Sequence, residues 1–112
     1  MIKQMQVREE TASGKHAEQW TVYILRCKDG TLYTGITKDI KRRVKQHNDG
    51  KGSKYTQTRR PVNMVYKEHI MGRANALVRE AEIKHYSKGK KEQLVSTFNI
   101  TKPKSKLLPR QS

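Results

Sequence analysis

The pattern of hydrophobic and polar residues predicts three β-strands. The runs WTVYILRC (20–27) and TLYTGI (31–36) are rich in β-branched and aromatic residues, and an Asp-Gly pair lies between them. Such runs on either side of a turn are typical of a β-hairpin. The segment PVNMVYKEHI (61–70) alternates enough to be a third strand, because proline is tolerated at the start of a strand. We therefore expect a small sheet in which the hairpin supplies two strands.

Other segments have the spacing of helices. In the first of them Ile40 and Val44 are four residues apart, Thr37 or Asp39 can cap the start, and Gly50 can end the helix. The second is rich in Ala, Leu and Glu, and the third is short. These predicted helices cover residues 38–50, 73–87 and 90–98. The order β-β-α-β-α-(α), without an internal repeat, indicates an α/β fold of the α+β type.

The length of the hairpin loop decides whether Tyr23 and Tyr33 face the same side, because side chains alternate along a strand. A two-residue loop would place the rings on opposite faces. A three-residue loop, 28–30, with its glycine in the left-handed conformation, pairs Tyr23 with Gly35 and places both rings on one face. A glycine opposite Tyr23 leaves the phenol room to tilt toward a ligand, which favours the longer loop. The alternative is that both tyrosines are ordinary strand formers.

The predicted helices place several polar side chains near the sheet. Arg43 and His47 are one turn apart beside the apolar stripe of the first helix. In the second, Glu80 falls inside an apolar arc, whereas Arg79 and Glu82 fall on the polar side. That arc is formed by Ala74, Ala76, Leu77, Val78, Ala81 and Ile83. A buried carboxylate needs a cation, a metal or a hydrogen-bond donor, so Glu80 is a candidate ligand. The structural alternative is an ion pair with Lys84 at i+4.

Composition narrows the class of partner. The chain of 112 residues has 25 Lys and Arg against 10 Asp and Glu, a formal charge of +15, which favours a polyanion such as nucleic acid. No apolar run is long enough to cross a membrane, and the single cysteine, Cys27, excludes an internal disulfide, so we expect a cytoplasmic protein. We expect one domain over 20–98, with a disordered arm at 1–19 and a disordered basic tail at 99–112.

These features together resemble a known family. The segment TVYILRCKDGTLYTGITKDIKRRVKQHN, followed by ALVREAEIK, is similar to the GIY-YIG nuclease domain. Tyr23 and Tyr33 stand at its two tyrosine positions, and Arg43, His47 and Glu80 stand in its helices. The resemblance is greatest to short stand-alone bacterial members of uncharacterised function and to the catalytic module of structure-specific endonuclease subunits. It implies a sandwich with a three-stranded antiparallel sheet flanked by helices.

The resemblance also implies a chemistry, namely attack of water on a phosphodiester. One of the two tyrosines, Tyr23 or Tyr33, would position or deprotonate the water, and the other would bind phosphate. Arg43 would hold the scissile phosphate, and His47 would donate to the phosphate or share a proton with a tyrosine. Glu80 would bind Mg²⁺ or Mn²⁺. Thr21 replaces the first glycine of the family motif, and no equivalent of an asparagine found in some members is evident.

The segment 51–60 is expected to be a loop that contacts the substrate. It combines basic residues with one tyrosine, a mixture suited to phosphate contacts and to stacking of a base or sugar on the ring. With Gly35, the candidate nucleic-acid contacts are Lys51, Lys54, Tyr55, Arg59 and Arg60. We expect a monomeric, metal-dependent endonuclease for DNA, branched or single-stranded forms included, with a role in repair or recombination. The alternative is a nucleic-acid-binding module that is inactive alone or requires a partner protein.

Overall fold

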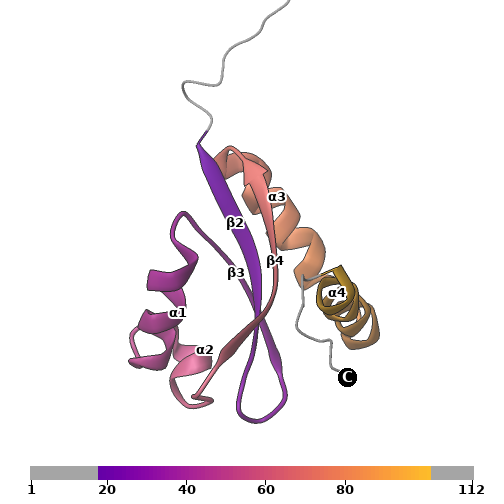
Figure 1. The fold of residues 1–112 in the computed structure, drawn as a ribbon. Helices are drawn as coiled ribbons and strands as arrows, with labels where there is room; N and C mark the ends of the chain where they lie inside the picture. The colour runs from indigo at the N-terminus through magenta and orange to yellow at the C-terminus, as the bar shows by residue number, and fades with distance from the viewer. Residues whose placement is uncertain (1–17, 102–112) are drawn as a thin grey trace, which may run out of the picture.

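The computed structural model describes residues 18–101, which form a three-stranded antiparallel sheet between two layers of helices (Figure 1). The strand order is β3-β2-β4, so β2 is the central strand, with β3 hydrogen-bonded to one edge of it and β4 to the other. The elements are β2 (Gln19–Arg26), β3 (Leu32–Thr37), α1 (Ile40–Asn48), α2 (Lys54–Gln57), β4 (Asn63–Met71), α3 (Arg73–Lys84) and α4 (Lys88–Thr101). The α/β fold with a three-stranded antiparallel sheet is confirmed.

The hairpin has the three-residue loop. The amide of Cys27 donates to the carbonyl of Thr31 at 2.8 Å, and Gly30 has a φ of 87°, the left-handed conformation that closes such a loop. As a result Tyr23 lies opposite Gly35, and Tyr33 lies opposite the residue two positions after Tyr23. Both tyrosines therefore face the same side of the sheet.

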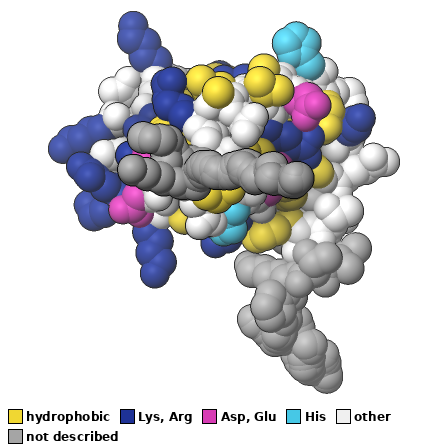
Figure 2. Space-filling view, turned by 90° about the horizontal axis from the view of Figure 1, so that it is seen from above, with side chains coloured by type: hydrophobic (Ala, Val, Ile, Leu, Met, Phe, Trp, Pro, Cys, Tyr) yellow, Lys and Arg dark blue, Asp and Glu magenta, His cyan; other side chains and the backbone are white. Residues whose placement is uncertain are grey.

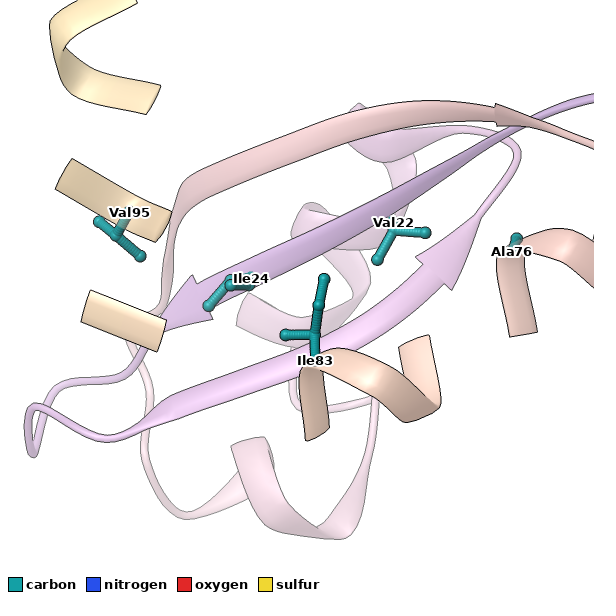
Figure 3. Packing of buried hydrophobic residues seen from close by; sticks show 5 residues of the cluster. All are labelled: Val22, Ile24, Ala76, Ile83 and Val95. Carbon is teal, nitrogen blue, oxygen red and sulfur yellow. The ribbon is translucent and has the colours of Figure 1, made fainter. Parts of the chain in front are cut away.

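The two faces of the sheet pack against different helices. On one face, Val22 and Ile24 of β2 contact Ala76 and Ile83 of α3 and Val95 of α4 (Figure 3). The other face carries Tyr23 and Leu25, with Cys27 and Val62 beside them and Ile40 and Val44 of α1 packed against them. Alternation along β2 thus sends the aliphatic residues toward α3 and α4, and Tyr23 toward α1.

The first helix is delimited as its sequence predicts. Of the two candidate caps, Asp39 is the one used, because its Oδ1 accepts from the amide of Arg42 at 3.2 Å. Gly50 follows the helix with a φ of 81°. Within the helix, Arg42 is exposed and Arg43 is half-buried, so Arg43 lies on the side near the sheet, as expected.

The apolar arc predicted for α3 is wrong for Leu77 and Val78, which are exposed instead of buried. Val78 is 65% exposed and Leu77 37% exposed, while Ala76 and Ile83 are fully buried. Arg79, expected on the polar side, is half-buried because its Nε donates to Glu68 of β4 at 2.8 Å. The ion pair with β4 turns this side of the helix toward the sheet, which periodicity within the helix cannot predict.

Two segments differ from expectation. The predicted loop 51–60 contains the short helix α2, and the predicted short helix 90–98 is the longer α4. Most of the predicted arms, 1–19 and 99–112, lies outside the described residues. Between residues 18 and 101, no helix combines the length and apolar character needed to span a bilayer.

Candidate active site

A buried hydrogen-bonded row lies between the sheet and the helices α1 and α2. Nε2 of His47 is 3.1 Å from the hydroxyl of Tyr23, and Nδ1 of His47 is 2.7 Å from the hydroxyl of Thr56. Tyr23 is 1% exposed, and His47 and Thr56 are 0% exposed. Both nitrogens of a fully buried imidazole are thus partnered, as burial of a polar ring requires.

Local sequence places Thr56 in this row. Ser53 caps α2, since its Oγ accepts from the amide of Thr56 at 3.1 Å. Gly52 precedes it, and a Cβ at that position would lie 2.2 Å from Nδ1 of His47, so only glycine fits beside the imidazole. Sequence reasoning did not identify Thr56 as a partner of His47, although a Ser-x-x-Thr cap directly after a glycine was the available signal.

The environment keeps both ring groups neutral. Burial, with a smaller contribution from Arg43, lowers the pKa of His47 from 6.5 to about 4. Burial raises the pKa of Tyr23 from 10.0 to about 12; hydrogen bonding and charge from Arg43 oppose the rise, whereas Tyr33 and Glu80 add to it. At neutral pH, His47 is therefore an uncharged imidazole and Tyr23 a protonated phenol.

Tyr33 forms the more accessible side of the cluster. Its ring meets His47 edge to face with centroids 5.1 Å apart, and it lies 6.0 Å from the ring of Tyr55 at an interplanar angle of 25°. Tyr33 is half-buried, in contrast to Tyr23. Tyr33 thus lies between the buried row and the exposed ring of Tyr55.

The guanidinium of Arg43 is held from two sides. Nη1 donates to Oε1 of Gln46, and Nη2 donates to the carbonyl of Gly52, each at 3.0 Å. Gly52 also packs against His47, so one backbone position constrains both side chains. The charge of Arg43 lowers the pKa values of both Tyr23 and His47.

Glu80 approaches from the other helix layer. Its helix, α3, packs on the face of the sheet opposite to Tyr23, yet its carboxylate is close enough to raise the pKa of Tyr23. The contact at Gly35 explains how the ring lies over β3: a Cβ on Gly35 would be 2.5 Å from the hydroxyl of Tyr23. The predicted ion pair is present as well, with Nζ of Lys84 3.4 Å from Oε2 of Glu80.

The five candidate catalytic side chains are therefore related in two ways. Four of them form one contiguous cluster on a single face of the sheet: Tyr23, Tyr33, Arg43 and His47. Glu80 belongs to the helix layer on the other face and acts on the cluster by raising the pKa of Tyr23.

Some of the candidate nucleic-acid contacts are exposed lysines, and others already form hydrogen bonds within the protein. Lys51 and Lys54 are exposed. Arg60 donates to the carbonyls of Gln57 and Asn48, at 2.9 and 3.3 Å.

The ring of Tyr55, expected to stack on a base or sugar, already has a partner. The guanidinium carbon of Arg59 lies 3.9 Å from its centroid, and Arg59 is anchored to Asp29 at 3.1 Å and to the carbonyl of Tyr55 at 2.8 Å. A base that stacks on this side of the ring must displace Arg59.

Glu80 is the candidate ligand for a divalent metal ion. The side chain is 17% exposed and is paired with a displaceable ammonium group, so a cation already occupies this position. Among residues 18–101 no group of three His, Cys, Asp or Glu side chains could enclose a metal. This single carboxylate fits Mg²⁺ or Mn²⁺, because such ions retain waters and take their other ligands from substrate phosphates.

Comparison with known proteins agrees with this geometry. Residues 19–93 match the family described as the GIY-YIG catalytic domain, and the chain belongs to that family. Membership supports a nuclease-like function and implies DNA binding. Nucleases of the family generally depend on a divalent metal.

Two shorter relatives match this chain over most of their own length. A UPF0213 protein of Staphylococcus saprophyticus is 53% identical over 75 residues, which are 67% of this chain and 92% of that protein. A UPF0213 protein of Staphylococcus aureus is 53% identical over 74 residues, 66% of this chain and 90% of the relative.

Two solution NMR structures are also similar. The protein EF2693 from E. faecalis, 37% identical, has a TM-score of 0.51 over 73% of this chain and 88% of its own. The UPF0213 protein BH0048 from Bacillus halodurans, 49% identical, has a TM-score of 0.47 over 70% of this chain and 84% of its own.

Proposed function

We propose that this chain is a metal-dependent DNA endonuclease that hydrolyses phosphodiester bonds, with branched or single-stranded DNA as substrate and a role in repair or recombination. One observation carries the proposal: Tyr23 of β2, Tyr33 of β3 and His47 of α1 meet in one cluster, with the hydroxyl of Tyr23 3.1 Å from Nε2 of His47 and the ring of Tyr33 5.1 Å from the ring of His47. Groups from three separate elements that influence one another in this way are characteristic of an active site.

The two tyrosines take different roles. Tyr23 is 1% exposed and its pKa is about 12, so it is a poor base and is suited to hold His47 and Arg43 in place. Tyr33 is half-buried, and within the described chain its hydroxyl makes no hydrogen bond to protein. Tyr33 therefore orients the attacking water. The neutral imidazole of His47 packs against the ring of Tyr33 from the buried side.

Arg43 and Glu80 provide the charges that hydrolysis needs. The fork of Arg43, already oriented by Gln46 and Gly52, binds the scissile phosphate through two nitrogens. Glu80 holds Mg²⁺ or Mn²⁺, which supplies positive charge for the negative charge that develops on the phosphate oxygens. Charged groups lower the activation barrier of hydrolysis most when they are held in position before the reaction. The hydrogen bonds to Gln46 and Gly52 hold the guanidinium of Arg43 in this way.

The wall of the site is formed by the segment after α1. Lys51 and Lys54 contact phosphates, Arg59 and Tyr55 form a stacked surface next to Tyr33, and Arg60 extends it. Gly35, expected to contact nucleic acid, is buried beneath the phenol of Tyr23 and therefore lies outside this wall. We expect a cytoplasmic monomer in which selectivity comes from this wall or from a partner protein.

The test is cleavage of a panel of labelled DNAs (duplex, flap, fork and single strand, with RNA controls) by purified protein with Mn²⁺ or Mg²⁺. Glu80→Gln and Arg43→Ala should lower cleavage at least about a hundredfold, and Arg43→Lys should not restore it. The exposed neighbour variant Arg42→Ala is the matched control and should retain most activity. Absence of cleavage for every substrate and metal, with folded protein, contradicts the proposal.

A second function is favoured by the single carboxylate and its ion pair. A nucleic-acid-binding module that is inactive alone would keep Glu80 paired with Lys84 and would have no need of a metal. Titration with Mg²⁺ in the absence of DNA separates the two functions. Amide shifts near Glu80 and Tyr33 support the enzyme, whereas shifts that appear only with DNA support the binding module.

A further inference from the structure

We propose that Lys84 couples metal binding to DNA binding: its ammonium group sits on Glu80 in the free protein and moves to a DNA phosphate in a groove at the outer edge of β3. This inference rests on the proposed function, because it requires both ligands. It adds a second wall to the DNA site, on α3 and α4, across from the segment 51–60.

The pair between Lys84 and Glu80 is built to be exchanged. Glu80 is the more buried partner, with a side chain 17% exposed, and Lys84 is the more exposed one, with a side chain 52% exposed. Their separation of 3.4 Å exceeds the 2.7 Å of the other i, i+4 pair, Lys45 with Asp49. An ion pair of this length with a largely exposed lysine contributes little stability, so a competing anion can separate it.

A groove supplies that competing position. It has a volume of about 210 Å³ and lies along β3, an outer strand of the sheet. Aromatic rings line one part, and ammonium groups from two different helices line another. The lining residues are Leu32, Tyr33, Thr34, Tyr55, Lys84 and Lys91. Rings beside lysines are the combination that binds a single nucleic-acid strand, through sugar or base contact and phosphate contact respectively.

Lys84 thus belongs to two sites at once. It lines the groove next to Tyr33, and it neutralises the carboxylate that would hold the metal. Its flexible four-carbon stem allows the ammonium to leave one anion for another without movement of the backbone. Lys91 lines the same groove and forms no ion pair within the described residues, so it can serve the phosphate alone.

The consequence is thermodynamic coupling. An ammonium and a divalent cation compete for the same carboxylate, so Lys84 weakens metal binding while it remains there. A phosphate in the groove draws Lys84 away and leaves Glu80 free, so DNA strengthens metal binding. By reciprocity, bound metal strengthens DNA binding by the same factor.

The experiment measures the two affinities separately for matched lysine-to-methionine variants, which keep the aliphatic stem. Mn²⁺ affinity is obtained without DNA from paramagnetic broadening of amide signals, and affinity for a single-stranded oligonucleotide is obtained in EDTA as a function of salt. Lys84→Met should bind Mn²⁺ about two- to fivefold more tightly, the gain expected from loss of one exposed ion pair. It should bind DNA more weakly, with a salt slope smaller by about 0.7–1.

Two controls separate this coupling from a general effect of charge. Lys91→Met should weaken DNA binding as Lys84→Met does but leave Mn²⁺ affinity unchanged. Lys67→Met, in β4 at the edge of the sheet opposite to β3, should change neither. Equal gains in Mn²⁺ affinity for all three variants, or unchanged Mn²⁺ affinity in Lys84→Met, overturns the inference. Wild-type protein that binds neither DNA nor Mn²⁺ would instead refute the proposed function.

Discussion

Gly35 is the residue over which the phenol of Tyr23 lies. It lies opposite Tyr23 in the hairpin, and the missing side chain allows the phenol to lean over β3. Parity left two loop lengths open, and the sequence favoured this pairing because a glycine opposite Tyr23 leaves room for the phenol. What parity could not predict is that the tilted phenol would be buried, since burial depends on α1 and α2, which pack over it from a later part of the chain.

Gly35→Ala tests this contact. A methyl group there would lie 2.5 Å from the hydroxyl of Tyr23, so the ring must move and break its bond to His47. We expect a loss of about 1–3 kcal/mol in the free energy of unfolding, measured with urea, and a parallel loss of cleavage. Gly89→Ala in α4 meets only a contact at 3.9 Å and should be neutral or stabilising. An unchanged stability for Gly35→Ala contradicts the packing described.

His47 makes a second prediction at this scale. Its pKa is about 4 in the folded protein and 6.5 when unperturbed, so the unfolded chain binds more protons between these values. Its contribution to stability is therefore complete above pH 6.5 and is lost as the pH falls toward 4. We expect the free energy of unfolding to drop by about 1–2 kcal/mol between about pH 6.5 and pH 5, a range in which carboxylates remain mostly ionised.

The measurement is urea unfolding over that pH range. His47→Gln should flatten the pH dependence whatever its own stability, whereas His85→Gln, at an exposed position, should leave the slope intact. A wild-type slope that survives in His47→Gln would assign the effect to another group.

At the scale of elements, the rotation of α3 decides the position of Glu80. Arg79 donates from two nitrogens to Glu68 of β4 and from Nη1 to Glu82 and to the hydroxyl of Tyr86. These contacts hold the helix with Arg79 toward β4. Periodicity within α3 correctly predicted that Glu80 is not fully exposed but misplaced the centre of the buried face, because Glu68 is far away in the sequence.

Arg79→Lys tests the importance of this connection. Lysine keeps the charge but cannot donate through a planar fork to several acceptors, so we expect a loss of about 1–3 kcal/mol in the free energy of unfolding. Because Glu80 is the next residue, cleavage should fall even at temperatures at which the variant is fully folded. Arg73→Lys, an exposed substitution at the start of the same helix, should change stability by less than about 0.5 kcal/mol. Equal effects of the two substitutions would contradict this role.

At the scale of the whole molecule, charge governs association. The chain carries a formal charge of +15, and on the face in Figure 2 Lys and Arg side chains project outward with few acidic side chains between them. An excess of this kind binds polyanions through release of counterions. Composition alone favoured a polyanion as the partner, whereas the fold brings Lys84 and Lys91 to one groove.

The salt dependence of DNA binding follows from that selection. If Lys51, Lys54, Lys84 and Lys91 each contact one phosphate of a single strand, affinity should fall about 50-fold between about 50 and 200 mM salt. The measurement is fluorescence anisotropy with a labelled oligonucleotide in EDTA. An affinity that is independent of salt would show that the basic side chains do not contact phosphates.

By itself the sequence predicted the three strands, the helices α1 and α3, the hairpin register and the proximity of Arg43 to His47. These features follow from alternation, helical spacing and one glycine, all of which act between neighbours along the chain. Only the tertiary structure decided the burial of Tyr23, the bond between His47 and Thr56, the rotation of α3 and the place of Lys84 between Glu80 and the groove beside β3. Each of these depends on contacts between separate elements, where burial and charge pairing outweigh local pattern.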